Sequence, residues 1–288
     1  MSRSFLSSSP ELDSFSDQII NHIYRYCIEI NGKNITHESP FRQILFVGLY
    51  SFGRLLESLR NLADNGQYYA YPIISRSLLE IALRLNDIAN HSSGKRDAQC
   101  FKLVRNDQGR KLKRLYKALE NEKDILYQTA EEKIAETLSD LEYYIKMFPK
   151  SKNHLKDLFN KDLVIAPECT FQNPQISQLV REFHKEDSSL NDYYGITMCG
   201  RTHFSLSGVD ISMTESGVLD LSPSEKDIDL FLGMSCCLAL DLVKLTNREY
   251  QLGKEEEIEL IVKKLHQPYI EAYKSKESEK RSTESVDG

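Results

Sequence analysis

The stretch Ser39–Gly66, SPFRQILFVGLYSFGRLLESLRNLADNG, has clear helix signals at both ends. Ser39 is a suitable N-cap, and Pro40 stands at the first helical position, where its missing N–H group leaves no intrahelical bond unmade. Asn65-Gly66 ends the pattern, because these residues readily adopt the left-handed conformation found at helix ends. Apolar residues between these signals occupy more than one face. The stretch therefore predicts a central, buried helix in a helical protein.

Similar signals bound further helices on both sides of this stretch. Ser9-Pro10 begins the first one, in which apolar residues recur at three- and four-residue steps. Ser222-Pro223 opens a capping box before a strongly apolar run. The predicted helices are residues 10–31, 72–90, 223–250 and 254–273.

The segment 95–148 is long, helical in pattern and rich in charge. Its first part, Lys95–Lys117 (KRDAQCFKLVRNDQGRKLKRLYK), is strongly basic, whereas residues 120–142 carry many acidic side chains. A seam of leucine and isoleucine residues runs through both parts. The pattern predicts a long amphipathic hairpin or a protruding helix, with a break or kink at Gly109 and an end at Pro149.

Helical signals are weaker between this segment and the apolar run near the end. We expect short helices near 155–159 and 174–185, and one helix over 192–204. Around a turn at Gly217, apolar and polar residues alternate, which predicts a small β-hairpin near 209–221.

Taken together, these elements predict an all-α fold, a single bundle of about seven to nine helices with one small β-hairpin. Residues 10–273 are expected to form this single helical domain. Residues 1–9 and the polar tail 274–288 are expected to be disordered.

Composition narrows the functional classes. The net charge is −6, which argues against a general nucleic-acid coat but leaves room for a local basic patch. No apolar run is long enough to span a bilayer, and no signal peptide is visible. We therefore expect a cytoplasmic protein that has no membrane partner. The six cysteines have no metal-ligand spacing and are expected to be buried small residues, so neither a metal nor a cofactor is predicted. P-loop, dinucleotide-binding, zincin and α/β-hydrolase motifs are absent from the sequence.

Two pairs of oppositely charged residues stand inside apolar helices. Arg76 and Glu80 are four apart on one predicted helix, and Arg54 and Glu57 are three apart on another. Each pair therefore shares a helix face. If the two helices pack antiparallel, the pairs can meet in a polar pocket. The alternative is a salt-bridge network without a ligand.

A further candidate is YYGITMCGRTHFSLSG, Tyr193–Gly208. His203 could act as a general acid or base, and Arg201 could hold a phosphate or carboxylate. The alternative interpretation is a hydrogen-bonded histidine and a basic residue at a polar helix end.

The motifs IISRSLLEIALRL and DYYGITMCGRTHFSLSG resemble an uncharacterised bacterial family of all-helical proteins, a domain of unknown function. Its pattern is an R-x-x-x-E helix and a distal Tyr/His helix, and this resemblance implies a site of Arg76, Glu80, Tyr194 and His203. A second likeness is to HEPN ribonucleases, whose paired arginine and histidine would be Arg84 and His91. That likeness implies a dimer in which the histidine acts on the ribose 2′-hydroxyl.

Two functions of different class follow. The first is an RNA-directed protein, either a metal-independent ribonuclease or a toxin effector in bacterial antiviral defence. The alternative is a non-enzymatic helical adaptor or sensor, whose segment 95–148 binds a protein partner or whose charged cluster holds a small ligand. The expected partners are RNA or protein, and a homo-dimer or a larger complex is expected.

Overall fold

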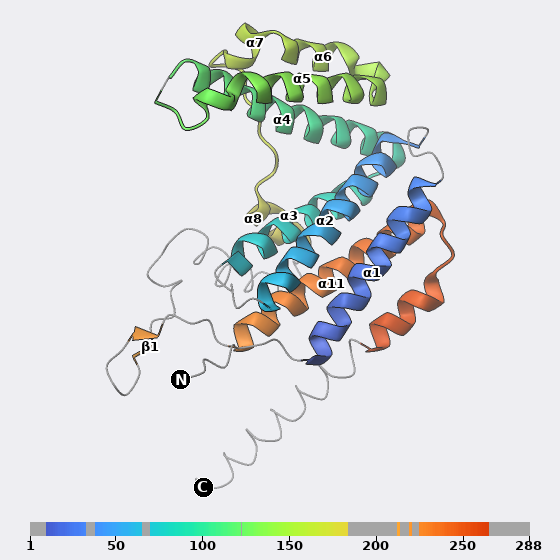
Figure 1. Cartoon of the computed structure of the whole chain (residues 1–288). Helices are drawn as coiled ribbons and strands as arrows, with labels where there is room; N and C mark the ends of the chain where they lie inside the picture. The colour runs from blue at the N-terminus through green and yellow to red at the C-terminus, as the bar shows by residue number, and fades with distance from the viewer. Residues whose placement is uncertain are drawn as a thin grey trace, which may run out of the picture. The chain divides into compact units, whose positions relative to one another are not determined.

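The computed structural model describes residues 10–32, 38–64, 70–121, 123–183, 212–213, 219–220 and 225–264. This described part of the chain is all-α, as predicted (Figure 1). Of the regions predicted to be disordered, 1–9 and 274–288 lie outside the described residues, and so does the predicted helix 192–204.

The helices with clear end signals lie where the sequence predicts them, within one or two residues. They are α1 (Pro10–Asn31), α2 (Pro40–Asp64), α3 (Tyr71–Ala89) and α11 (Glu225–Tyr250). Residues 255–264 form a further helix, and the rest of the predicted last helix lies outside the described residues. Pro10, Pro40 and Pro72 stand in the first turns of α1, α2 and α3, and Asn31 ends α1, so these signals mark helix ends well.

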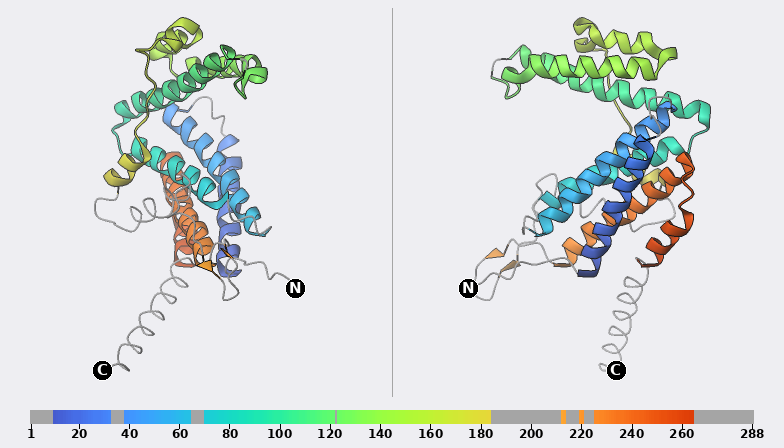
Figure 2. Two further views of the ribbon diagram at one scale, coloured as in Figure 1. Left: turned by 90° about the vertical axis from the view of Figure 1, so that its left-hand side faces the viewer. Right: turned by 45° about the vertical axis from the view of Figure 1, so that its right-hand side comes forward.

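The segment 95–148 folds as a helical hairpin. Its helices are α4 (Ser93–Leu119) and α5 (Ala130–Met147), joined through the 3₁₀ turn η3 (Tyr127–Thr129). The two views of Figure 2 show α4 and α5 side by side. Of the two predicted forms, the hairpin is confirmed, and α5 ends just before Pro149 as expected.

Of the break or kink predicted at Gly109, the break is wrong, and the kink stays a prediction. Helix α4 continues through Gly109, which is buried. A Cβ atom at this position would lie 2.3 Å from Cε1 of Phe171. The glycine is therefore a packing site, where the helix surface is low enough for an aromatic ring to lie against the backbone.

Replacement of Gly109 by alanine is expected to lower the free energy of unfolding by about 1–3 kcal/mol, because the added methyl group overpacks the contact with Phe171. Gly94→Ala is the matched control, since a Cβ at Gly94 in the same helix would meet nothing within 4 Å. Denaturant unfolding of both variants checks the prediction. Equal stability of the two variants would show that the ring moves aside without cost.

Short helices follow α5. They are η4 (Pro149–Ser151), α6 (Lys152–Lys156), η5 (Asp157–Phe159), α7 (Lys161–Ile165) and α8 (Ile176–Phe183). With 255–264 included, the described residues hold ten α-helices rather than seven to nine. The excess comes from single-turn helices such as α7, which the Asn160 side chain caps by accepting from two backbone N–H groups. One turn is too short for a visible apolar period.

Two very short strands are also described. Strand β1 (Ser212–Met213) pairs antiparallel with β2 (Leu219–Asp220), with Ser212 opposite Asp220. Most of the predicted hairpin at 209–221, including its turn, lies outside the described residues, so the complete hairpin stays a prediction.

The chain divides into two compact units. The first unit comprises Met1–Lys33, Phe46–Asn86 and Val180–Gly288, and the second comprises Asn34–Leu45 and Asp87–Leu179. The predicted single domain is not tested by this division. Both units are mainly helical where they are described, and the two short strands belong to the first.

The first unit packs α1, most of α2 and α3, and α11 around an apolar core. Helices α1 and α2 approach closely, because a Cβ on Gly53 would lie 2.8 Å from Cγ2 of Ile23. Tyr71 of α3 and Phe231 of α11 make an edge-to-face ring contact at 6.4 Å. Phe52 is fully buried, as expected for a central α2, whereas Val47 and Tyr50 of the same helix are exposed.

In the second unit, α4 packs along α5 and α7, and α5 packs along α6. Cys100 and Leu112 of α4 and Leu141 of α5 are fully buried in this core. No helix within the described ranges has the length and apolar character needed to cross a membrane.

Candidate functional site: a basic groove on α4

Helix α4 has a strongly basic surface. It carries nine lysine or arginine residues and only two aspartates among its 27 residues. Arg110, Lys113, Arg114 and Lys117 follow the spacing i, i+3, i+4, i+7, so all four lie on one helix face. These four residues therefore form a row of positive charges along one face of α4.

A segment without helix or strand, residues 166–173, begins with a turn at 167–168, lies against this face and forms a wall. Lys113 Nζ donates to the backbone carbonyls of Ala166 at 2.9 Å and Cys169 at 2.7 Å. Asn106 Nδ2 donates to the carbonyl of Gln172 at 2.6 Å. The segment is thus attached to α4 at two places by side chains of that helix.

Between these attachments, Phe171 packs against α4. Its side chain is buried, and its ring lies on the backbone at Gly109. The guanidinium carbon of Arg105 stands 5.4 Å from the ring centroid, which is a cation–π contact. The wall is therefore held by apolar contact as well as by hydrogen bonds.

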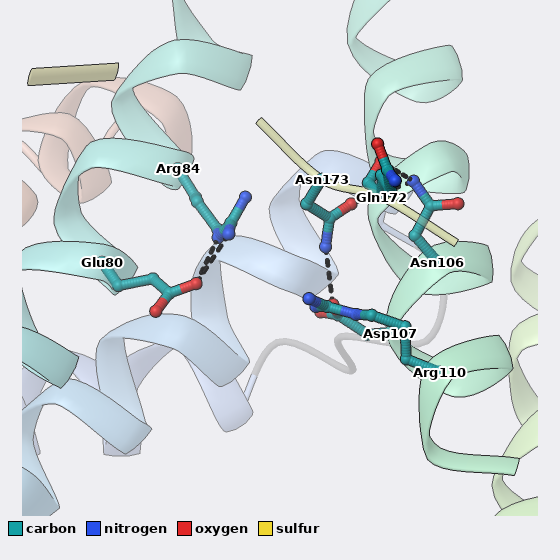
Figure 3. A network of polar contacts seen from close by, with 7 residues as sticks. All are labelled: Glu80, Arg84, Asn106, Asp107, Arg110, Gln172 and Asn173. Carbon is teal, nitrogen blue, oxygen red and sulfur yellow. Dashed lines mark hydrogen bonds and ion pairs between the residues drawn. The ribbon is translucent and has the colours of Figure 1, made fainter. Parts of the chain in front are cut away.

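A carboxylate lies at the end of the wall. Asn173 Nδ2 donates to Asp107 Oδ1 at 2.6 Å, and Arg110 Nη2 binds the same oxygen (Figure 3). Asp107 therefore links the wall to a cation of the groove and orients the Arg110 guanidinium.

The helix face and the wall line an open cavity of about 370 Å³, which we call the basic groove. Its lining consists of four cations of α4 and a mostly uncharged wall. The lining residues are Arg110, Lys113, Arg114, Lys117, Pro167, Cys169, Thr170, Phe171 and Gln172.

The positive charge of the basic groove is only partly compensated. Arg110 pairs with Asp107, and Arg114 pairs with Asp124 at 2.8 Å. Lys117 has no acidic partner among the described residues, and Lys113 binds only neutral carbonyls. An array of this kind can bind an anion with several negative oxygens, since arginine and lysine are the usual phosphate ligands.

The polar pocket predicted between the two Arg/Glu pairs stays a prediction. Arg54 and Glu57 are 3.5 Å apart, and Arg54 is exposed. Tyr24 of α1 donates to Glu57 at 2.6 Å. Burial, and then the bond to Glu57, raises the pKa of Tyr24 to about 12, so the phenol stays protonated at neutral pH.

Glu80 binds Arg84, which lies four residues after it on α3. Both Nε and Nη2 of Arg84 donate to one carboxylate oxygen of Glu80, at 2.9 and 2.6 Å (Figure 3). The Arg76 side chain is half-buried. An i,i+4 pair on one helix needs no ligand to explain it, so it favours a structural role for Glu80 and Arg84.

The remaining predicted site residues are only partly described. His91 is half-buried, and its carbonyl accepts from Arg96 Nε at 2.9 Å. Tyr194, Arg201 and His203 lie outside the described residues. The predicted convergence of His203 with Arg76 and Glu80 therefore stays a prediction.

The cysteines follow the prediction in part. Cys27, Cys100 and Cys236 are buried, and burial raises the pKa of the Cys27 thiol to about 11. Cys169 is half-buried and Cys237 is exposed, so these two depart from the prediction. Within the described ranges, no three His, Cys, Asp or Glu side chains are placed to hold a metal ion.

The basic stretch is plain in the sequence, but the groove was not predicted. The signal was the one-face spacing of the cations in RKLKRLYK, Arg110–Lys117. The wall lies about sixty residues after these cations in the sequence, and its residues carry no recognisable motif. Comparison with known proteins finds no matching family model, no similar curated protein and no similar solved structure.

Proposed function

We propose that this protein is RNA-directed and that the basic groove binds the phosphate backbone of RNA. The observation that carries the proposal is the row of Arg110, Lys113, Arg114 and Lys117 beside a wall fixed to the same helix. Phosphate contacts of arginine and lysine supply most of the affinity of sequence-independent nucleic-acid binding.

The length of the basic face supports a polymer rather than a single small anion. From Lys102 to Lys117, α4 rises by about 22 Å at 1.5 Å per residue. At about 3.4 Å per phosphate, the spacing along one strand of double-stranded DNA, this length corresponds to about six phosphates of a nucleic-acid backbone. The net charge of the whole chain is −6, so the basic groove would attract RNA locally rather than over the whole surface.

The wild-type protein is expected to bind a labelled RNA 12-mer with a strong salt dependence. Four phosphate contacts predict a slope of about −3 in log K against log salt, and an affinity loss of about fiftyfold between 50 and 200 mM NaCl. Fluorescence anisotropy over this range measures the slope.

A DNA 12-mer of the same sequence belongs in the same experiment, because phosphates alone do not distinguish the two polymers. Tighter binding of RNA supports the proposal, and tighter binding of DNA reassigns the groove to DNA. Absence of RNA binding at 50 mM NaCl contradicts the proposal outright.

Ribonuclease or toxin activity in antiviral defence remains a narrower proposal. It rests on the likeness of His203, or of the pair Arg84 and His91, to known acid–base sites, and not on the basic groove. The groove supports it only in that it could hold the backbone of an RNA substrate.

A further inference from the structure

A second cavity adjoins the basic groove in the same unit. It measures about 470 Å³ and shares the wall residues Thr170 and Gln172 with the groove. On α4 it lies over the turn before the four cations, where Phe101, Lys102, Arg105 and Asn106 line it. His154 of α6 completes the lining, and we call this cavity the aromatic pocket.

The aromatic pocket differs from the basic groove in chemistry, because it offers flat side chains. The rings of Phe101 and His154 stand 6.4 Å apart at 59°. Phe148 meets Phe101 edge-on at 5.8 Å, so the Phe101 ring is fixed by packing. The Arg105 guanidinium, a third flat group, is placed by its contact with the Phe171 ring. Unpaired nucleobases stack on aromatic rings and on guanidinium planes of this kind.

Neutral hydrogen-bonding groups surround these flat groups. Thr170 and Gln172 are exposed, and Asn106 is fixed by its bonds to the Gln172 carbonyl and to Asn173 Oδ1. Hydroxyl and amide groups can both donate to and accept from the edge of a base. Four cations line the groove, whereas the aromatic pocket has two, Lys102 and Arg105, and adds stacking surfaces and neutral polar groups.

We propose that the aromatic pocket receives an unstacked nucleobase of the RNA whose phosphates lie in the basic groove, so the protein selects single-stranded over duplex RNA. This inference rests on the proposed function. A base within a duplex is stacked on both faces and paired along its edge, so it cannot enter the pocket without disruption of the helix. A single strand can place its phosphates on Arg110–Lys117 and turn one base into the adjoining pocket.

The test compares a single-stranded RNA 12-mer with the blunt duplex of the same sequence, at one salt concentration and with the full chain. The single strand is expected to bind at least tenfold more tightly. Replacement of His154 by alanine removes one stacking surface and is expected to weaken single-strand binding at least about fivefold. His154 is 72% exposed, so its loss leaves the fold intact. Asn153→Ala, an exposed change on the same helix, is the matched control.

A spectroscopic readout separates stacking from simple charge attraction. An RNA 12-mer with one 2-aminopurine should lose fluorescence on binding to the wild type. The loss should be smaller on binding to His154→Ala or to Arg105→Lys. Arg105→Lys keeps the positive charge but removes the flat guanidinium. Equal affinity for single strand and duplex would overturn the inference and leave the proposed function standing. A single-strand preference that both variants retain in full would overturn it as well. Failure of the wild type to bind either RNA would contradict the proposed function itself.

Discussion

Replacement of Arg110, Arg114 and Lys117 by glutamine is expected to weaken RNA binding about 100-fold at 0.1 M salt. Each lost phosphate contact removes about 0.7 of a logarithmic unit in the binding constant at this salt concentration. The slope of log K against log salt should fall in magnitude by about two. The three side chains are exposed, and surface ion pairs such as Arg114 with Asp124 contribute about 1 kcal/mol or less, so the fold should persist.

The matched control is the triple variant Lys244→Gln, Arg248→Gln and Lys263→Gln. It removes the same number of positive charges from exposed positions on α11 and residues 255–264. Its RNA affinity should change only a few-fold, because the overall charge is altered equally but the basic groove is intact. If both triple variants lose affinity to the same extent, binding depends on net charge, and the groove has no special role.

Replacement of Phe171 by alanine is expected to lower the free energy of unfolding of the second unit by about 3–5 kcal/mol. The Phe171 side chain is 5% exposed, fills the space above Gly109, and lies beneath the Arg105 guanidinium. RNA affinity should also fall, although no charge is removed, because the wall of the basic groove loses its apolar contact with α4. Thermal unfolding and RNA anisotropy measure the two effects.

Phe159→Ala is the control for this change, since Phe159 belongs to the same unit but is 40% exposed. Its cost should be about 1–2 kcal/mol, and its effect on RNA affinity should be small. A Phe171→Ala variant that is as stable as Phe159→Ala would show that the wall collapses onto Gly109. A variant that is less stable but binds RNA normally would show that the hydrogen bonds of Asn106 and Lys113 hold the wall without the ring.

Local signals were sufficient for much of the fold. Pro10, Pro40 and their preceding serines define helix starts that the chain uses, and the helical hairpin follows from the apolar seam of residues 95–148. The break predicted at Gly109 is absent because a glycine within a helix can serve either as a break or as a packing surface. Only the contact with Phe171, far away in sequence, separates these roles.

The candidate site was less predictable, for a related reason. The charge of α4 was plain from the sequence, but a groove requires a second surface. The attachment of Gln172 and Asn173 to Asn106 joins residues 66 and 67 positions apart, through ordinary amide groups. The pairing of Glu80 with Arg84 was missed because Glu80 has arginines both four residues before and four residues after it. Spacing alone cannot choose between two equivalent neighbours on one face.

The bonding of Lys113 has a consequence for how an anion would be received. Arg110 and Arg114 already hold carboxylates, which offset part of the positive charge that an arriving phosphate would meet there. Lys113 Nζ donates to two carbonyl oxygens, which fix its position but do not neutralise its positive charge. An ammonium group has three hydrogens, so one is left to bind a phosphate. A phosphate can therefore be added at Lys113 without displacing anything. Acetylation of the Lys113 amine would remove its positive charge and also disrupt its hydrogen bonds to the carbonyls of Ala166 and Cys169.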